Sequence, residues 1–293
     1  MLNVSIELLL TQMSLGLVNG AYYALLSLGL CIIFGILDVV NFAHGALYMM
    51  GAFFAWVLNY YFGLGYWWSL LLVPLLVAVF GIVIEQLAFR HLYAIHHVYG
   101  FLLTFGLVLM LESFFRIAFA GLSTSYAVPT QLTGVLDFGF MLMPIYRAWV
   151  VVASAVLCFG TWWVIEKTFL GSYLRAAIER RELVGAFGIN VPRLVTLTFA
   201  FGCALAGLGG VFAAPIFPIT PYMGQSITTV VFAVVVIGGL GSIPGAILGG
   251  YVLGMVEGLS QAFYPEASSV SIFLIMMLVL LLKKSGFAGK AVG

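Results

Sequence analysis

Charged residues are scarce in this sequence. Only 7% of the 293 residues are Asp, Glu, Lys or Arg, whereas an ordinary soluble domain has about 25%. Hydrophobic residues make up 64%, and the mean hydropathy is +1.20. A soluble globule of this length still exposes about a quarter of its unfolded surface, so it cannot hide so much apolar surface from water. The composition therefore excludes most soluble enzyme classes and indicates a polytopic membrane protein.

Other absences narrow the function further. The formal net charge is only +1, which provides no electrostatic field for binding nucleic acid. The three cysteines lie in apolar runs without metal-ligand spacing, so neither a disulfide framework nor a zinc site is predicted. The sequence has no Gly-x-Ser-x-Gly elbow and no phosphate-binding loop. We therefore expect no catalytic residues, no cofactor and no metal site, and if the protein uses ATP, a separate chain must hydrolyse it.

Long apolar runs separated by polar breaks dominate what is present. A bilayer span needs about 20 apolar residues, so the chain has room for about eight to ten spans. The runs are continuous, whereas the strands of membrane barrels alternate in hydropathy. The expected fold class is an all-α polytopic membrane protein, with residues 1–293 forming one transmembrane domain.

The distribution of basic residues predicts the orientation in the membrane. Residues 166–193 contain five of the 11 basic residues, namely Lys167, Arg175, Arg180, Arg181 and Arg193. The C-terminal tail adds Lys283, Lys284 and Lys290, and a polar patch contains Arg90, His91, His96 and His97. The positive-inside rule places these three regions in the cytoplasm and the segment Ser123–Arg147 outside. The N-terminus is then periplasmic, the C-terminus cytoplasmic, and the number of crossings odd, most simply nine.

Two stretches resemble each other in hydropathy. Residues 35–51 and residues 238–250 each consist of an apolar run, a short break and a Gly-Ala step into another apolar run. Interrupted hydrophobic segments at corresponding positions of two halves are typical of transporters. The sequence therefore predicts an internal repeat, although two ordinary tight helix connections would give the same pattern.

Polar residues inside the apolar runs are candidates for the translocation pathway, because such residues are costly in lipid and face the protein interior or a partner. Glu112 and Arg116 are four residues apart and predict a structural ion pair, and Glu257 with Gln261 forms a similar pair. Glu257 either lines the pore or contacts a partner, and Asn19 either bonds across helices or contacts substrate. The pathway candidates are Asn19, Asn41, His44 and Glu257.

Residues 166–193 form the predicted contact region with a soluble partner. The segment from Leu170 to Arg193 has the pattern of an amphipathic helix, with Ser172 as N-cap and Gly188 or Asn190 as its end before Pro192. One face carries Leu174, Ala177, Ile178 and Gly185. Two interpretations stay open: a solvated interfacial helix, or a docking helix that enters a groove on a cytoplasmic protein.

Three motifs together resemble a known family. The pattern Arg175-Ala-Ala-x4-Glu182-x3-Ala186-x-Gly188-Ile189-Asn190 is similar to the cytoplasmic coupling motif of LivH-type permease subunits of branched-chain amino acid ATP-binding-cassette (ABC) importers. Asn41–Gly51 and Gly238–Gly250, the latter followed by Glu257, resemble that family's two other signatures. The chain differs at Glu179, Arg180 and Arg181, where family members often have an acid pair.

The resemblance implies a permease subunit of the inner (plasma) membrane of bacteria, half of a pathway for Leu, Ile or Val. Its partners would be a second homologous permease subunit, two ATP-binding subunits, a periplasmic binding protein and membrane lipid. The implied coupling residues are Leu174, Arg175, Ala176, Ala177, Glu179, Glu182, Ala186, Gly188 and Ile189. An importer of urea or short amides, a stand-alone secondary transporter and a structural subunit remain alternatives.

Overall fold

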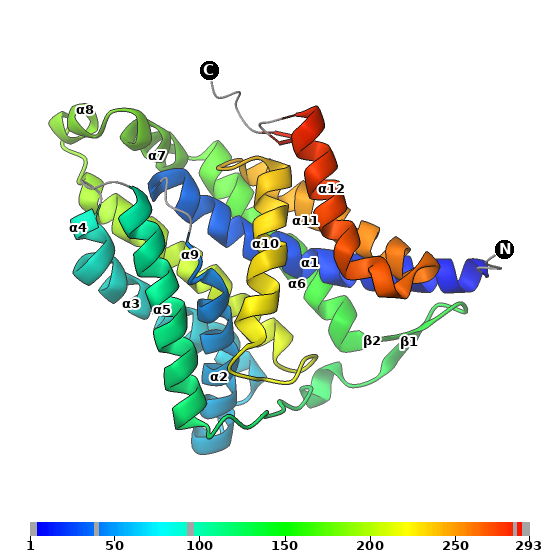
Figure 1. The fold of residues 1–293 in the computed structure, drawn as a ribbon. Coiled ribbons are helices and arrows are strands. Elements are labelled where there is room, and N and C mark those ends of the chain that lie inside the picture. Colours follow the sequence, from blue (N-terminus) through cyan, green and yellow to red (C-terminus); the bar gives the residue numbers. More distant parts are fainter. Residues whose placement is uncertain (1–4, 38–40, 93–96, 284–285, 289–293) are drawn as a thin grey trace. The chain divides into compact units, whose positions relative to one another are not determined.

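The computed structural model describes residues 5–37, 41–92, 97–283 and 286–288, so His96, Lys284 and Lys290 lie outside the described residues. The elements in chain order (Figure 1) are α1 (Ile6–Leu37), α2 (His44–Phe62), α3 (Tyr66–Ile84), the π-helix η1 (Glu85–Phe89), α4 (Arg90–Leu92), α5 (His97–Ala118), the 3-10 helix η2 (Thr130–Leu132), β1 (Val135–Asp137), β2 (Leu142–Pro144), α6 (Ile145–Lys167), α7 (Phe169–Glu179), α8 (Arg181–Ala186), α9 (Val191–Ala213), α10 (Met223–Gly238), α11 (Ile243–Phe263), the 3-10 helix η3 (Pro265–Ala267) and α12 (Ser268–Leu282).

Helices dominate the described residues, and β1 and β2 form a single small antiparallel hairpin in which Leu136 lies opposite Met143. Six helices, α1, α3, α5, α6, α9 and α11, are long and apolar enough to cross a membrane, and α10 and α12 are shorter apolar helices. The 19-residue α2 is a further apolar helix. The predicted all-α polytopic class is confirmed, while the number of crossings and their orientation stay predictions.

The chain divides into two compact units, and each is assembled from separated stretches of sequence. Unit 1 comprises Met1–Leu28, Val128–Phe159 and Thr229–Gly293, and unit 2 comprises Gly29–Ala127 and Gly160–Thr228. The boundaries fall inside α1, α6 and α10. Because neither unit is a continuous stretch of sequence, the single domain over residues 1–293 stays a prediction.

Glycines bring α1 and α11 into backbone contact in unit 1. Gly16 and Gly20 on α1 face Gly254 and Gly258 on α11, and a Cβ added to Gly16 would lie 2.5 Å from the Gly254 carbonyl oxygen. Lipid offers no hydrophobic force between helices, so van der Waals packing of small residues holds such crossings together. Spacings of four residues on both helices place these glycines on one face of each helix.

Helix α9 packs against α2 and α3 in unit 2 (Figure 1). Gly51 of α2 lies against Gly207 of α9, where a Cβ on Gly51 would be 2.7 Å from the Gly207 Cα. The fully buried Phe53 stacks on Phe115 and Phe119, with ring centroids 4.8 and 4.7 Å away. Small residues and aromatic rings thus form the core of this unit.

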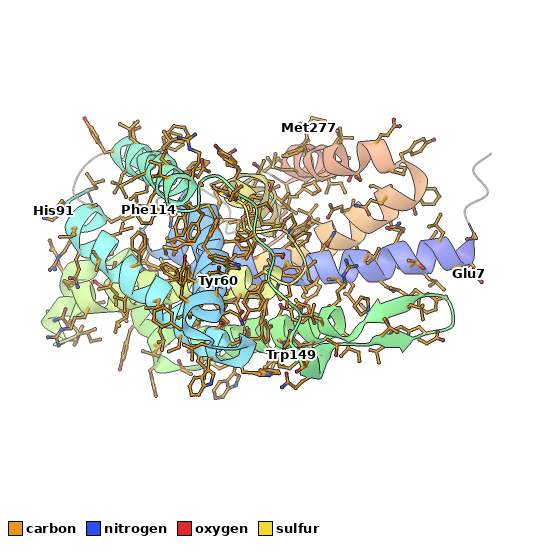
Figure 2. The ribbon with its side chains drawn as sticks, turned by 90° about the horizontal axis from the view of Figure 1, so that it is seen from below. Glu7, Tyr60, His91, Phe114, Trp149 and Met277 are labelled. Atoms are coloured by element: carbon orange, nitrogen blue, oxygen red, sulfur yellow. The ribbon has the colours of Figure 1, made fainter. Side chains whose placement is uncertain are left out.

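Many large apolar side chains lie on the surface of the described helices. Phe114 of α5 and Met277 of α12, both labelled in Figure 2, are 62% and 55% exposed. In water such surfaces are a liability, but the hydrocarbon core of a membrane solvates them. The exposed apolar residues of α3, α5 and α12 therefore agree with helices that face lipid.

Both predicted breaks in the apolar runs are helix–break–helix segments. Helix α1 ends at Leu37 and α2 begins at His44, although residues 38–40 lie outside the description. In the second break, Gly239 and Gly241 have φ values of 101° and 78°, which favour glycine. The Ser242 side chain then caps α11 by accepting a hydrogen bond from Gly245 N at 3.2 Å. The repeat relation between the two segments stays a prediction.

The predicted ion pair between Glu112 and Arg116 is wrong. Both residues are described, yet Glu112 Oε2 accepts a hydrogen bond from Gln225 Nε2 at 2.8 Å, and Arg116 Nη1 donates to the Tyr222 hydroxyl at 3.4 Å. A partner one helical turn away is available to both side chains, but the segment that begins α10 offers better-placed neutral groups. Tertiary contacts therefore override the helical spacing here.

Candidate functional site

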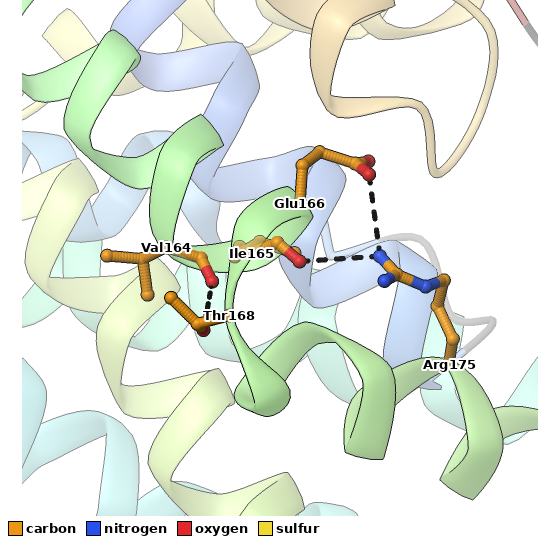
Figure 3. Close-up of polar contacts among 5 residues, drawn as sticks. All are labelled: Val164, Ile165, Glu166, Thr168 and Arg175. Carbon is orange, nitrogen blue, oxygen red and sulfur yellow. Dashed lines mark hydrogen bonds and ion pairs between the residues drawn. The ribbon is translucent and has the colours of Figure 1, made fainter.

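A compact elbow connects the end of α6 to α7 in unit 2. The guanidinium of Arg175 reaches back from α7, with Nη1 3.6 Å from Glu166 Oε2 and 3.3 Å from the Ile165 carbonyl oxygen (Figure 3). The two side chains are 48% and 39% exposed, and exposed ion pairs contribute at most about 1 kcal/mol. We infer that the pair orients α7 against α6 and adds little to stability.

Glycine and threonine close the same elbow. The Thr168 hydroxyl donates a hydrogen bond to the Val164 carbonyl (Figure 3). A Cβ added to Gly171 would lie 2.6 Å from the Ile165 carbonyl carbon, which is closer than real Cβ contacts. Only glycine lets α7 begin so close to the end of α6, and the two helices therefore meet without a flexible linker.

Helix α7 has an inner and an outer face, and the inner face carries the residues expected to meet a partner. Leu174 and Ala177 are buried together with Gly171, because residues three apart lie on one side of a helix. Arg175, Ala176 and Glu179 are exposed on the outside. Of the predicted contact face, Leu174 and Ala177 therefore pack against the protein itself, whereas Ile178 and Gly185 are exposed. The outer surface of α7 is left for a partner.

Large apolar side chains extend that outer surface. Phe169 and Phe187 are 80% and 85% exposed, and Tyr173 and Leu183 are also exposed. Phe169, Tyr173 and Leu183 belong to the short helices α7 and α8, and Phe187 directly follows α8; none of the four lies in the six long apolar helices. Exposed apolar side chains beside charged ones are typical of surfaces that bind another protein. We call the exposed residues of α7 and α8 the coupling surface.

The predicted single helix is two helices. Helix α7 starts at Phe169 after Thr168, so Ser172 lies inside the helix and does not cap it. The helix breaks at Arg180, where φ is −145°, and α8 follows with exposed Glu182 and Ala186. The predicted stop at Gly188 is confirmed by its φ of 81°. Asn190 instead caps α9, and its side chain accepts a hydrogen bond from Arg193 N.

A groove of about 630 Å³ lies in unit 2 between the η1–α4 segment and the α8–α9 region. It is lined by Glu85, Arg90, Glu182, Gly185, Ile189, Asn190, Val191, Pro192 and Val195. The predicted coupling residues Glu182 and Ile189 thus line the groove wall, and the positive φ of Gly188 turns the chain between them. The groove forms because the chain reverses here before it enters α9.

Two groove residues were missed at the sequence level. The carboxylate of Glu85 is buried and accepts a hydrogen bond from the Thr196 hydroxyl at 2.7 Å. Glu85 also begins a π-helix, which in proteins often marks a functional site. Arg90 lines the groove as well. In the sequence, Glu85 directly follows an apolar run and Arg90 belongs to the polar patch used to predict the orientation, and both positions also fit ordinary interfacial residues.

In unit 1 the structure joins two of the four pathway candidates. Glu257 Oε2 accepts hydrogen bonds from the Tyr23 hydroxyl at 2.7 Å and from Asn19 Nδ2 at 3.3 Å. The predicted partner Gln261 forms no hydrogen bond to Glu257, which corrects that expectation among the described residues. Tyr23 was missed at the sequence level, because a tyrosine in an apolar run gives no sign of which group its hydroxyl contacts.

The other two pathway candidates lie in unit 2, where α2 begins. Asn41 and His44 are only 1% and 2% exposed. Asn41 Oδ1 accepts a hydrogen bond from Ala43 N at 3.1 Å, which orders the start of the helix. The hydrogen bond and the burial give Asn41 a structural task, and its pathway role stays a prediction, as does that of His44.

The comparisons with known proteins decide the family. Residues 12–282 match the family described as the permease component of branched-chain amino acid transport systems. The chain belongs to this permease family. It is 29% identical to the high-affinity branched-chain amino acid transport system permease protein LivH of Escherichia coli (strain K12), over 96% of both chains. It is 30% identical to BraD of Pseudomonas aeruginosa, also a high-affinity branched-chain amino acid permease protein, again over 96% of both chains.

A third relative is archaeal. The probable branched-chain amino acid transport permease protein LivH of Methanocaldococcus jannaschii is 29% identical over 90% of this chain and 88% of its own. No solved structure matches the chain. The matched range includes every predicted coupling residue and all four pathway candidates of this permease. The chain is therefore a multi-pass membrane protein and a transport subunit.

Proposed function

We propose that this permease is the membrane subunit of an ABC importer for leucine, isoleucine and valine. A periplasmic binding protein delivers the amino acid, a second homologous permease subunit completes the pathway, and two ATP-binding subunits drive it. The relatives are named as branched-chain amino acid permeases, and the similarity covers nearly their whole length. This favours branched-chain amino acids over urea and short amides as the substrate class. The sequence has no phosphate-binding loop, so ATP must be hydrolysed by a partner.

The coupling surface carries this proposal. It is short, charged and rich in exposed apolar side chains, and the elbow at Gly171 and Arg175 ties it to the long helix α6. A displacement of α7 is therefore transmitted to α6, because no flexible linker separates the two helices. We place residues 166–193 in the cytoplasm, where Arg175, Ala176 and Glu179 meet the ATP-binding subunits while Leu174 and Ala177 hold α7 against the permease.

Reconstitution tests the proposal. The permease is incorporated into proteoliposomes with its partner permease, ATP-binding subunits and binding protein, and uptake of radiolabelled leucine is measured. We expect uptake that requires internal ATP and external binding protein. Uptake by the permease alone under an ion gradient would instead establish a secondary transporter, and uptake of labelled urea in place of leucine would overturn the substrate class.

A further inference from the structure

Glu257 is held at the crossing of α1 and α11 in unit 1. The glycine contacts bring the two backbones together, so a side chain that leaves α11 beside Gly254 and Gly258 reaches α1 at once. Its carboxylate oxygen Oε2 accepts hydrogen bonds from Tyr23 at 2.7 Å and from Asn19 at 3.3 Å. The carboxylate is therefore held in place where the two helices cross.

The contacts around Glu257 leave its negative charge uncompensated. Tyr23 and Asn19 are neutral donors, and both bind the same oxygen. In the described part of the chain, no basic side chain forms an ion pair with Glu257, and it is the only charged residue of α11. It lies about 9 Å from the C-terminal end of that helix, by a rise of about 1.5 Å per residue. An ionisable residue within a helix long and apolar enough to cross a membrane is expected to have a partner of opposite charge.

The second carboxylate oxygen, Oε1, is free to receive that partner. It accepts no hydrogen bond from the described residues, and the Glu257 side chain is half-buried rather than enclosed. Asn19 and Tyr23, which donate to Oε2, each have an oxygen that can also accept a hydrogen bond. Several oxygen acceptors around one negative charge match an ammonium group, which has three N–H donors.

We propose that Glu257, with Asn19 and Tyr23, binds the α-ammonium group of the amino acid during its passage. This inference rests on the proposed function, because the importer carries zwitterions. The site would make the pathway itself select amino acids over urea and short amides, because these have no ammonium group. The charge-assisted hydrogen bond is the stronger kind, and it orients the substrate with its ammonium group toward α11.

The test is Glu257→Gln in the reconstituted importer. Glutamine keeps the shape of the side chain and an oxygen acceptor for Tyr23, so it removes the charge and preserves the helix contact. We expect leucine uptake to fall about tenfold or more, from the loss of a hydrogen bond to a charged group. Hydrolysis of ATP stimulated by the loaded binding protein should stay within about twofold. Glu266→Gln, on the exposed η3, is the matched control and should leave both activities unchanged.

Ligand binding supplies the second measurement. Equilibrium dialysis of the complete detergent-solubilised complex, without binding protein, should show retention of 3-methylbutylamine, which has the ammonium group alone. Retention of 4-methylpentanoate, which has the carboxylate alone, should be much weaker. Glu257→Gln should abolish the retention of the amine, and Glu257→Asp should keep part of it if the glutamine variant fails to assemble.

The outcomes separate this inference from the proposed function. Wild-type importer that fails to take up leucine with ATP refutes the proposed function. Wild-type importer that works, together with a Glu257→Gln variant that transports leucine and retains the amine as well as wild type, refutes the ammonium site alone. Equal retention of the amine and the carboxylate by wild-type complex would also overturn it.

Discussion

Single residues decide how closely the helices of this permease approach. Gly171 is the clearest case, because a side chain there would overlap the Ile165 carbonyl group, and the elbow between α6 and α7 would have to open. By contrast, Gly160 on α6 has open space around its Cβ position. The two glycines have the same chemistry and differ only in what surrounds them, so they form a matched pair.

Gly171→Ala is expected to destabilise the elbow by about 1–3 kcal/mol, as overpacking does elsewhere. It should also reduce leucine uptake per ATP hydrolysed, because α7 no longer sits firmly on α6. Thermal unfolding in detergent and the ratio of uptake to hydrolysis measure the two effects. Gly160→Ala should be neutral or slightly stabilising, since alanine favours helix. Equal behaviour of the two variants would remove the elbow from the coupling proposal.

At the scale of elements, α7 has one face that packs inward and one that is exposed. Its inner residues Leu174 and Ala177 hold it to the permease, while its outer residues Arg175, Ala176 and Glu179 remain available to a partner. The break at Arg180 then turns α8 so that Glu182 lines the groove. The predicted coupling motif therefore mixes residues that pack against the permease with residues that face outward.

Neighbouring alanines separate these two tasks. Ala176→Asp is expected to change stability by no more than about 0.5 kcal/mol, yet to weaken binding of the ATP-binding subunits, because it puts a charge on the outer face. Ala177→Asp should cost about 3–5 kcal/mol, because it leaves a charge buried without a partner. Thermal unfolding and co-purification with the ATP-binding subunits measure the pair. Normal co-purification of a stable Ala176→Asp protein would contradict the docking role of the outer face.

At the scale of the whole molecule, the distribution of charge predicts how the chain is oriented in the membrane. The basic stretch over residues 166–193 and the weakly charged stretch over residues 123–147 belong on opposite sides by the positive-inside rule. The native cysteines Cys31, Cys158 and Cys203 are all buried. They are therefore expected to react little with a membrane-impermeant thiol reagent, so that labelling reports on an introduced cysteine.

Cysteine labelling checks the orientation. Phe138→Cys, in the exposed turn of the β-hairpin, should react with a membrane-impermeant maleimide in intact cells. Glu182→Cys, on exposed α8, should react only in inside-out vesicles or after permeabilisation. The parent protein should remain unlabelled on both sides. Labelling of both substituted positions from the same side would refute the predicted topology.

Much of this protein followed from its sequence by local rules. In lipid every backbone polar group must be satisfied within the segment, so continuous apolar runs predict helices without further information. The low content of charged residues indicated a membrane protein. Polar and glycine residues predicted the breaks near residues 41 and 241, and Gly188 predicted the end of the predicted coupling region. The family was also recognisable, because its motifs are short stretches whose spacing lies in the chain itself.

Only the tertiary structure decided which residues meet. Helical spacing predicted partners for Glu112 and Glu257 one turn away, but their hydrogen bonds go to Gln225 and Tyr23, which are 113 and 234 residues distant in sequence. The inward turn of Leu174 and Ala177 and the groove beside Glu85 depend in the same way on packing between distant segments. The sequence by itself determined the helices and their breaks, because these depend on neighbours along the chain. The choice of partners needed the fold, since a polar group in an apolar setting bonds to whichever group packing brings within reach.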